Sequence, residues 1–139
     1  MNALNTILQW LLSKACYTKK TAALTPNANF TSGTIKARRV GDEVQLDFIN
    51  LRSTQTGTMS IINGYLEEQF RPKEYQVVLG IYIPGSGNGM PAILEVQTNG
   101  YLQVQLNSAP AYGLYASARY VGGGLLKSSI FNPCKVVVA

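Results

Sequence analysis

Apolar and polar residues alternate along much of this chain with the period of two that is typical of β-strands. In segment 43–49, Val44, Leu46 and Phe48 alternate with Gln45 and Asp47, which predicts a strand with one buried and one wet face. Gly41 and Asp42 precede this strand and tolerate the positive φ of a tight turn. Residues 34–40 are therefore predicted to form the other strand of a hairpin.

A second hairpin is predicted over residues 93–106, around Asn99 and Gly100. Its apolar side chains are expected on one face and its polar ones on the other: Leu94, Val96, Leu102, Val104 and Leu106 against Glu95, Gln97, Gln103 and Gln105. Residues 75–83 are apolar at successive positions, which predicts a central strand covered on both faces. With shorter strands between turn signals, the pattern indicates an all-β fold, an antiparallel β-sandwich resembling a jelly roll.

One helix is predicted, in the N-terminal segment 1–17. Leu4, Leu8, Leu11 and Ala15 recur at helical spacing and form an apolar stripe. A helix this short is marginal alone, so the stripe must dock on its own domain, a second copy or the rest of a longer fibre. We expect self-association. Residues 18–29 are polar, contain Pro26 and show neither period, which predicts a linker before a head domain at residues 30–139.

The composition indicates a single domain of 139 residues with a net charge of +5. This charge favours acidic partners, but the densest basic runs are only Lys19-Lys20 and Arg38-Arg39. A nucleic-acid surface would cluster its cations, so no nucleic-acid partner is expected. The apolar N-terminal run is too short to span a bilayer and lacks a basic leader, so we expect synthesis in a cytoplasm and no membrane insertion.

Few residues suit catalysis or metal binding. The chain has no histidine and two distant cysteines, Cys16 and Cys134, so no metal and no cofactor are expected. We expect both cysteines to be reduced, and a single disulfide between them is the alternative. Glycoside hydrolysis needs two facing carboxyl groups. Asp47 and Glu95, on the polar sides of different strands, are the one pair that the sequence leaves open. We expect no enzymatic activity.

Several motifs occur in a distinctive order. The Gly41-Asp42 hairpin is followed by Phe70-Arg71-Pro72, by the Asn99-Gly100 hairpin and by a last strand at residues 114–121. In this order they resemble the receptor-binding head domains at the tips of bacteriophage tail fibres and baseplates, over residues 33–121. The resemblance implies a homotrimer in the virion tail tip that adheres to host cell-surface polysaccharide and contacts other tail or baseplate proteins. It also implies architectural roles for Phe70 in the core and Arg71 in its turn.

Saccharide sites combine aromatic rings with amide and carboxylate groups. Tyr82 precedes the glycine-rich loop 84–91, Asn88 lies in that loop, and Tyr112 and Tyr115 are expected to flank another turn. These four residues are the candidate ligand-binding residues, because loops are free to vary while strand faces serve the core. Two alternatives remain: a structural virion or assembly protein of the same fold that binds another protein, and a cellular carbohydrate-binding module.

Overall fold

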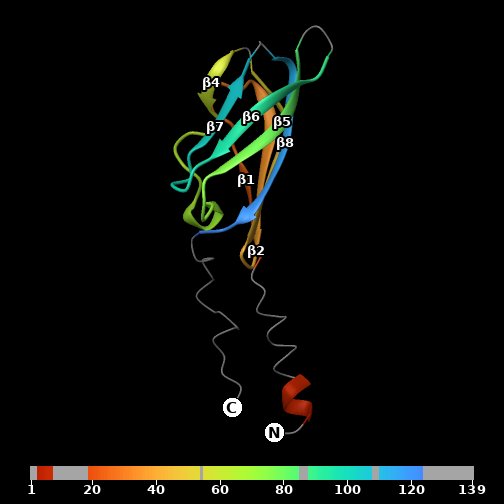
Figure 1. Ribbon diagram of the computed structural model, residues 1–139, viewed down its shortest axis with the longest axis vertical. Helices are drawn as coiled ribbons and strands as arrows, with labels where there is room; N and C mark the ends of the chain where they lie inside the picture. Colours follow the sequence, from red (N-terminus) through yellow and green to blue (C-terminus); the bar gives the residue numbers. More distant parts are fainter. Residues whose placement is uncertain (1–2, 8–18, 54, 85–87, 108–109, 124–139) are drawn as a thin grey trace.

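The computed structural model describes residues 3–7, 19–53, 55–84, 88–107 and 110–123, most of which lie in strands (Figure 1). The elements are β1 (Lys19–Leu24), β2 (Ser32–Val40), β3 (Glu43–Arg52), β4 (Gly57–Ser60), the 3-10 turn η1 (Glu68–Phe70), β5 (Gln76–Pro84), β6 (Met90–Val96), β7 (Leu102–Leu106) and β8 (Pro110–Val121), with a short helix at residues 3–7. Every strand pair is antiparallel, which confirms the predicted all-β class.

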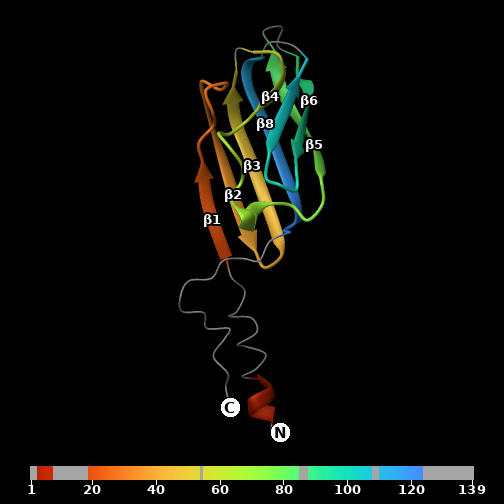
Figure 2. The same cartoon turned by 90° about the vertical axis from the view of Figure 1, so that its left-hand side faces the viewer.

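The eight strands form one continuous sheet in the order β1-β2-β3-β8-β5-β6-β7-β4. β8 joins the two halves, because it pairs with β3 on one side and with β5 on the other. The sheet curls so that the segments following its two edge strands meet: Pro26 forms a bridge with Ile62, and the Asn27 side-chain amide donates to the Ser60 carbonyl at 2.9 Å. The fold is thus a curled, sandwich-like half-barrel (Figure 2), and a jelly roll is not confirmed.

Strand alternation decides which side chains enter the half-barrel. All five apolar residues predicted on the inner face of the hairpin 93–106 are buried, so that prediction is confirmed. The largest fully buried side chains come from both halves of the sheet and from the segment between β4 and β5: Tyr82, Phe48, Phe70, Ile35, Leu46, Leu51, Ile61, Leu66, Leu94, Leu102, Leu106 and Leu114.

Residues 61–72 run across the open side of the half-barrel, from β4 to the start of β5 (Figure 2). Phe70 is fully buried there, and the Arg71 Nε donates to the Leu66 carbonyl at 2.8 Å. These contacts confirm the architectural roles predicted for Phe70 and Arg71.

Two buried polar side chains fasten η1 to the sheet. Arg39, only 3% exposed, donates from Nη1 to the Gln69 carbonyl at 2.9 Å and from Nε to the Gly41 carbonyl at 2.8 Å. The Tyr120 hydroxyl donates to the Phe70 carbonyl at 2.6 Å. Because a buried carbonyl without a donor is costly, these bonds hold η1 in place.

The predicted linker at residues 18–29 is wrong over residues 19–24, which form β1 and pair with β2 along its length. Ala22 and Leu24 pack against the core, and Ala23 between them faces outward, as does Thr21. The period of two is inconspicuous in the sequence, because an alanine stands both at an inward position, Ala22, and at an outward one, Ala23, and the two lysines that begin the strand are both exposed. The head therefore includes β1 and does not begin at residue 30.

Candidate functional site

The structure treats the four predicted ligand residues differently. The prediction that Tyr82 contacts a ligand is wrong, because the alternation of β5 points its side chain into the core and leaves none of its surface exposed. Asn88 is exposed in the loop between β5 and β6. Tyr115 is half-exposed on the outer face of β8. The side chain of Tyr112 lies outside the described part of the structure.

Tyr112 and Tyr115 do not flank a turn, because both belong to the long strand β8. The glycine-rich loop and the start of β8 nevertheless share one end of the sheet, since Pro84 and Pro110 are paired across β5 and β8. Ile81 connects them further: it is paired with Tyr115, and its side chain lies beside Gly89. Ligand binding by Asn88, Tyr112 and Tyr115 stays a prediction.

A hydrogen-bonded ladder of polar side chains crosses the outer face of three neighbouring strands, β2, β3 and β8. The Arg38 Nη2 donates to the Gln45 Oε1 at 3.0 Å, and the Gln45 Nε2 donates to the Asp47 Oδ1 at 3.0 Å. On the other side, the Ser117 hydroxyl donates to the same Oδ1 at 2.8 Å. The four groups are therefore held in one orientation on a rigid sheet.

Asp47 remains a carboxylate within this ladder. Partial burial raises its pKa, but the hydrogen bonds from Gln45 and Ser117 and the charges of Arg38 and Arg119 lower it, so the pKa lies below its ordinary value. The ladder thus presents fixed positive and negative groups side by side on an open surface.

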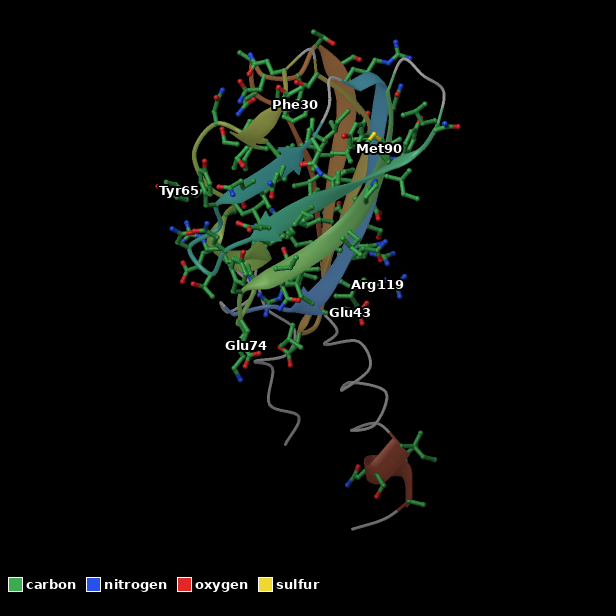
Figure 3. The ribbon with its side chains drawn as sticks, turned by 45° about the horizontal axis from the view of Figure 1, so that its top comes forward. Phe30, Glu43, Tyr65, Glu74, Met90 and Arg119 are labelled. Carbon is green, nitrogen blue, oxygen red and sulfur yellow. The ribbon has the colours of Figure 1, made fainter. Side chains whose placement is uncertain are left out.

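Two hollows open on the two sides of Arg38 and Gln45. One, of about 660 Å³, lies over the turn between β2 and β3 and the end of β8. Its walls combine apolar surface of Val40 and Val121 with the charges of Glu43 and Arg119, and the last two project near each other in Figure 3. The other hollow, of about 470 Å³, lies over β1 to β3 and includes Lys36. Arg38 and Gln45 line both hollows.

This ladder was not predicted from the sequence, although Gln45 and Asp47 were expected on the solvent-exposed face of their strand. The alternation of β2 was the signal that could have placed Arg38 beside them, because it points the adjacent Arg38 and Arg39 to opposite faces of the sheet. Arg38 joins the surface ladder, whereas Arg39 is buried beneath the sheet. Arg38-Arg39, one of the two densest basic runs, is therefore one surface cation and one structural cation.

The pair left open for hydrolysis does not assemble. Asp47 lies on β3 and Glu95 on β6, and β8 and β5 stand between them. Three strand spacings place these carboxyl groups at least roughly 14 Å apart, beyond the separation that either glycosidase mechanism uses. Within the described segments, no three His, Cys, Asp or Glu side chains come close enough to hold a metal ion.

The predicted self-association stripe is described only in part. Leu4, in the helix at residues 3–7, is 63% exposed. Leu8, Leu11 and Ala15 lie outside the described residues, as do Cys16 and Cys134. Where the chain is described, its helical segments are too short to cross a membrane.

No protein-family model matches this sequence, and no curated protein is significantly similar to it. Function must therefore be inferred from the surface chemistry described above.

Proposed function

We propose that this protein is a receptor-binding protein of a bacteriophage tail or baseplate tip that adheres, as a homotrimer, to saccharide on the host cell surface. The observation that carries the proposal is the ladder of Arg38, Gln45, Asp47 and Ser117, flanked by two hollows on the outer face of the sheet. The motif order over residues 33–121, which resembles that of phage tail-tip heads, supports the same function.

The ladder has the chemistry of a saccharide surface. Only one of the five guanidinium donors of Arg38 is used within the ladder, so others are available to sugar hydroxyl or phosphate oxygens. Val40 and Val121 supply apolar surface for the C–H faces of a sugar ring. Arg38 and Lys36 supply positive charge to the hollows, which favours a saccharide that carries phosphate or carboxylate groups. Several weak sites on one particle then add up through avidity.

Replacing Arg38 by glutamine tests the proposal. Binding should be measured on an array of bacterial cell-wall saccharides that includes phosphate-bearing and neutral polymers. Removal of charge-assisted hydrogen bonds should weaken binding about tenfold to a hundredfold. Arg52→Gln is the matched control, because it makes the same substitution at an exposed arginine outside both hollows. Equal binding by the two variants would reject the ladder as the ligand surface.

The second candidate function is a structural virion or assembly protein that binds another protein. The observation that favours it is the exposed apolar surface of β5, where Leu79 is 73% exposed. If the wild-type protein binds no saccharide on the array but is incorporated into the tail, this function replaces the first.

A further inference from the structure

The central strand β5 leaves its outer face uncovered. Val77, Leu79 and Ile81 are 58%, 73% and 61% exposed, while the residues between them point toward the half-barrel. The sequence predicted this strand to be covered on both faces, and within one copy of the chain that prediction is wrong. No described segment lies over this side of β5 in Figures 1 and 2.

The neighbouring strands extend this apolar surface. On β6, Ile93 is paired with Leu79, and on β8, Tyr115 is paired with Ile81. Both side chains are exposed, at 38% and 50%. We call Val77, Leu79, Ile81, Ile93 and Tyr115 the β5 face. A continuous exposed apolar surface in the middle of a sheet is typical of a surface that another protein covers.

Opposite charges border the β5 face. Glu95 on β6 is paired with Val77. β5 and β8 are antiparallel, and Ile81 is paired with Tyr115. Four residues further along each strand in the corresponding direction are Val77 and Arg119, so Arg119 and Glu95 stand at a similar level on opposite flanks of β5. The one ion pair among the described residues joins Arg39 to Asp42, so neither flanking charge has a salt-bridge partner there. The described partners of Glu95 are the neutral donors Gln103 and Tyr75.

This charge arrangement favours a second copy in parallel orientation. A rotation about an axis parallel to β5 brings the β8 flank of one copy to the β6 flank of the next, and so brings Arg119 to Glu95. A two-fold rotation about an axis across the strands would instead bring the two β8 flanks together, and with them the like charges of the two Arg119 side chains. The parallel arrangement also puts the N-terminal helices of all copies at one end, which a shared stripe through Leu4 requires.

We propose that the β5 face is the surface on which copies of this chain pack, with parallel strands and with Arg119 of each copy beside Glu95 of the next. The inference rests on the proposed function only for the number of copies, three. It excludes an antiparallel dimer and a stacked, head-to-tail fibre, and it makes Tyr115 a contact between copies instead of the saccharide contact predicted from the sequence.

Leu79→Asp is the first test, read by light scattering and sedimentation. Because Leu79 is exposed, the sheet signal in circular dichroism should be retained while the subunit dissociation constant rises about a hundredfold or more. Tyr65→Asp is the matched control: Tyr65 is 58% exposed, lies far from β5 in Figure 3, and should leave the assembly unchanged. A wild-type monomer at micromolar concentration, or a Leu79→Asp variant that assembles normally, would overturn the proposal.

A charge exchange tests the orientation. Arg119→Glu and Glu95→Arg should each weaken assembly about tenfold by opposing like charges, and the double variant should recover assembly to within about threefold of wild type. Lack of recovery would reject the parallel pairing. Saccharide binding by the Leu79→Asp monomer, measured on the same array, keeps the two proposals separate: a monomer that binds weakly but measurably supports both, whereas an intact trimer without binding contradicts only the adhesive function.

Discussion

Asn50 on β3 and Gly113 on β8 are in close contact where the register of the two strands shifts, and Asn50 occupies the space that a side chain at position 113 would need. Asn50 has a φ of +52°, the one positive value among the described non-glycine residues. A Cβ atom added to Gly113 would collide with the Asn50 Oδ1 and would lie 2.5 Å from the Asn50 Cα. The register shift between Phe48 and Leu51 is thus built from one left-handed residue and one glycine.

Gly113→Ala should lower the free energy of unfolding by about 2–4 kcal/mol, because backbone atoms of Asn50 occupy the space that a methyl group needs. Urea unfolding measures this change. Asn50→Gly should not rescue the variant, since the Asn50 Cα would remain. Gly89→Ala is the control, because its nearest neighbour is the Ile81 Cγ2 at 3.3 Å, and it should change stability by less than about 0.5 kcal/mol. Similar effects of the two alanines would contradict this account of the bulge.

The adjacent arginines should differ sharply in their contribution to stability. Arg39→Met leaves the carbonyls of Gln69 and Gly41 without their donor, and we expect a loss of about 2–4 kcal/mol. Arg38→Met removes only exposed contacts and should cost less than about 0.5 kcal/mol. Chemical unfolding of both variants, side by side, measures the difference. Equal losses would mean that the buried bonds of Arg39 do not hold η1.

Alkaline stability should depend on Tyr120. Burial raises the pKa of its hydroxyl well above the ordinary value near 10. Above that ordinary value the unfolded chain loses this proton while the folded chain keeps it, so stability is complete below about pH 10 and falls as the pH rises further. Tyr120→Phe should be about 1–2 kcal/mol less stable at neutral pH, because it loses the bond to Phe70, and should show a shallower alkaline decline. An unchanged alkaline slope would contradict the assignment.

Acid should act in the opposite direction through Asp47. Its pKa is lowered in the folded protein, so its contribution to stability is present above the unfolded value near 3.9 and is lost as the pH falls through the folded value. Asp47→Asn should reduce the slope of unfolding free energy against pH below about pH 4. Ser117→Ala, which removes one of the lowering hydrogen bonds, should give an intermediate slope. Identical slopes in all three proteins would contradict the ladder's effect on Asp47.

The protein should release no reducing sugar from a polysaccharide that it binds. Asp47 and Glu95 are separated by two strands, so they cannot flank one glycosidic bond. A reducing-end assay on the bound polymer checks this expectation. Sugar release that disappears in Asp47→Asn or Glu95→Gln would contradict it.

Much of the strand content could be predicted from the sequence, because alternation and turn chemistry are local properties. The hairpin at 93–106 and the Gly41-Asp42 turn follow from neighbouring residues alone, whereas the buried role of Phe70 was implied by the resemblance to tail-tip heads. β1 escaped prediction because its outward and inward residues differ little in polarity.

The candidate site was less predictable, because it depends on which strands become neighbours. The Ser117 hydroxyl meets Asp47 across 70 positions of sequence, and only the insertion of β8 between β3 and β5 brings them together. The inward turn of Tyr82 likewise follows from the register of β5, not from its place beside a glycine loop.

By itself, the sequence determined the all-β class, the two hairpins and the apolar character of β5, since each depends on a period of two or on a turn dipeptide. The tertiary structure alone decided that one face of β5 is buried and the other exposed, and that Arg38 and Arg39 point to opposite faces of the sheet. It also decided that Arg38, Gln45, Asp47 and Ser117 share a surface. The physical reason is that a strand's pattern fixes the two faces it presents, whereas long-range pairing and the curl of the sheet decide what each face meets.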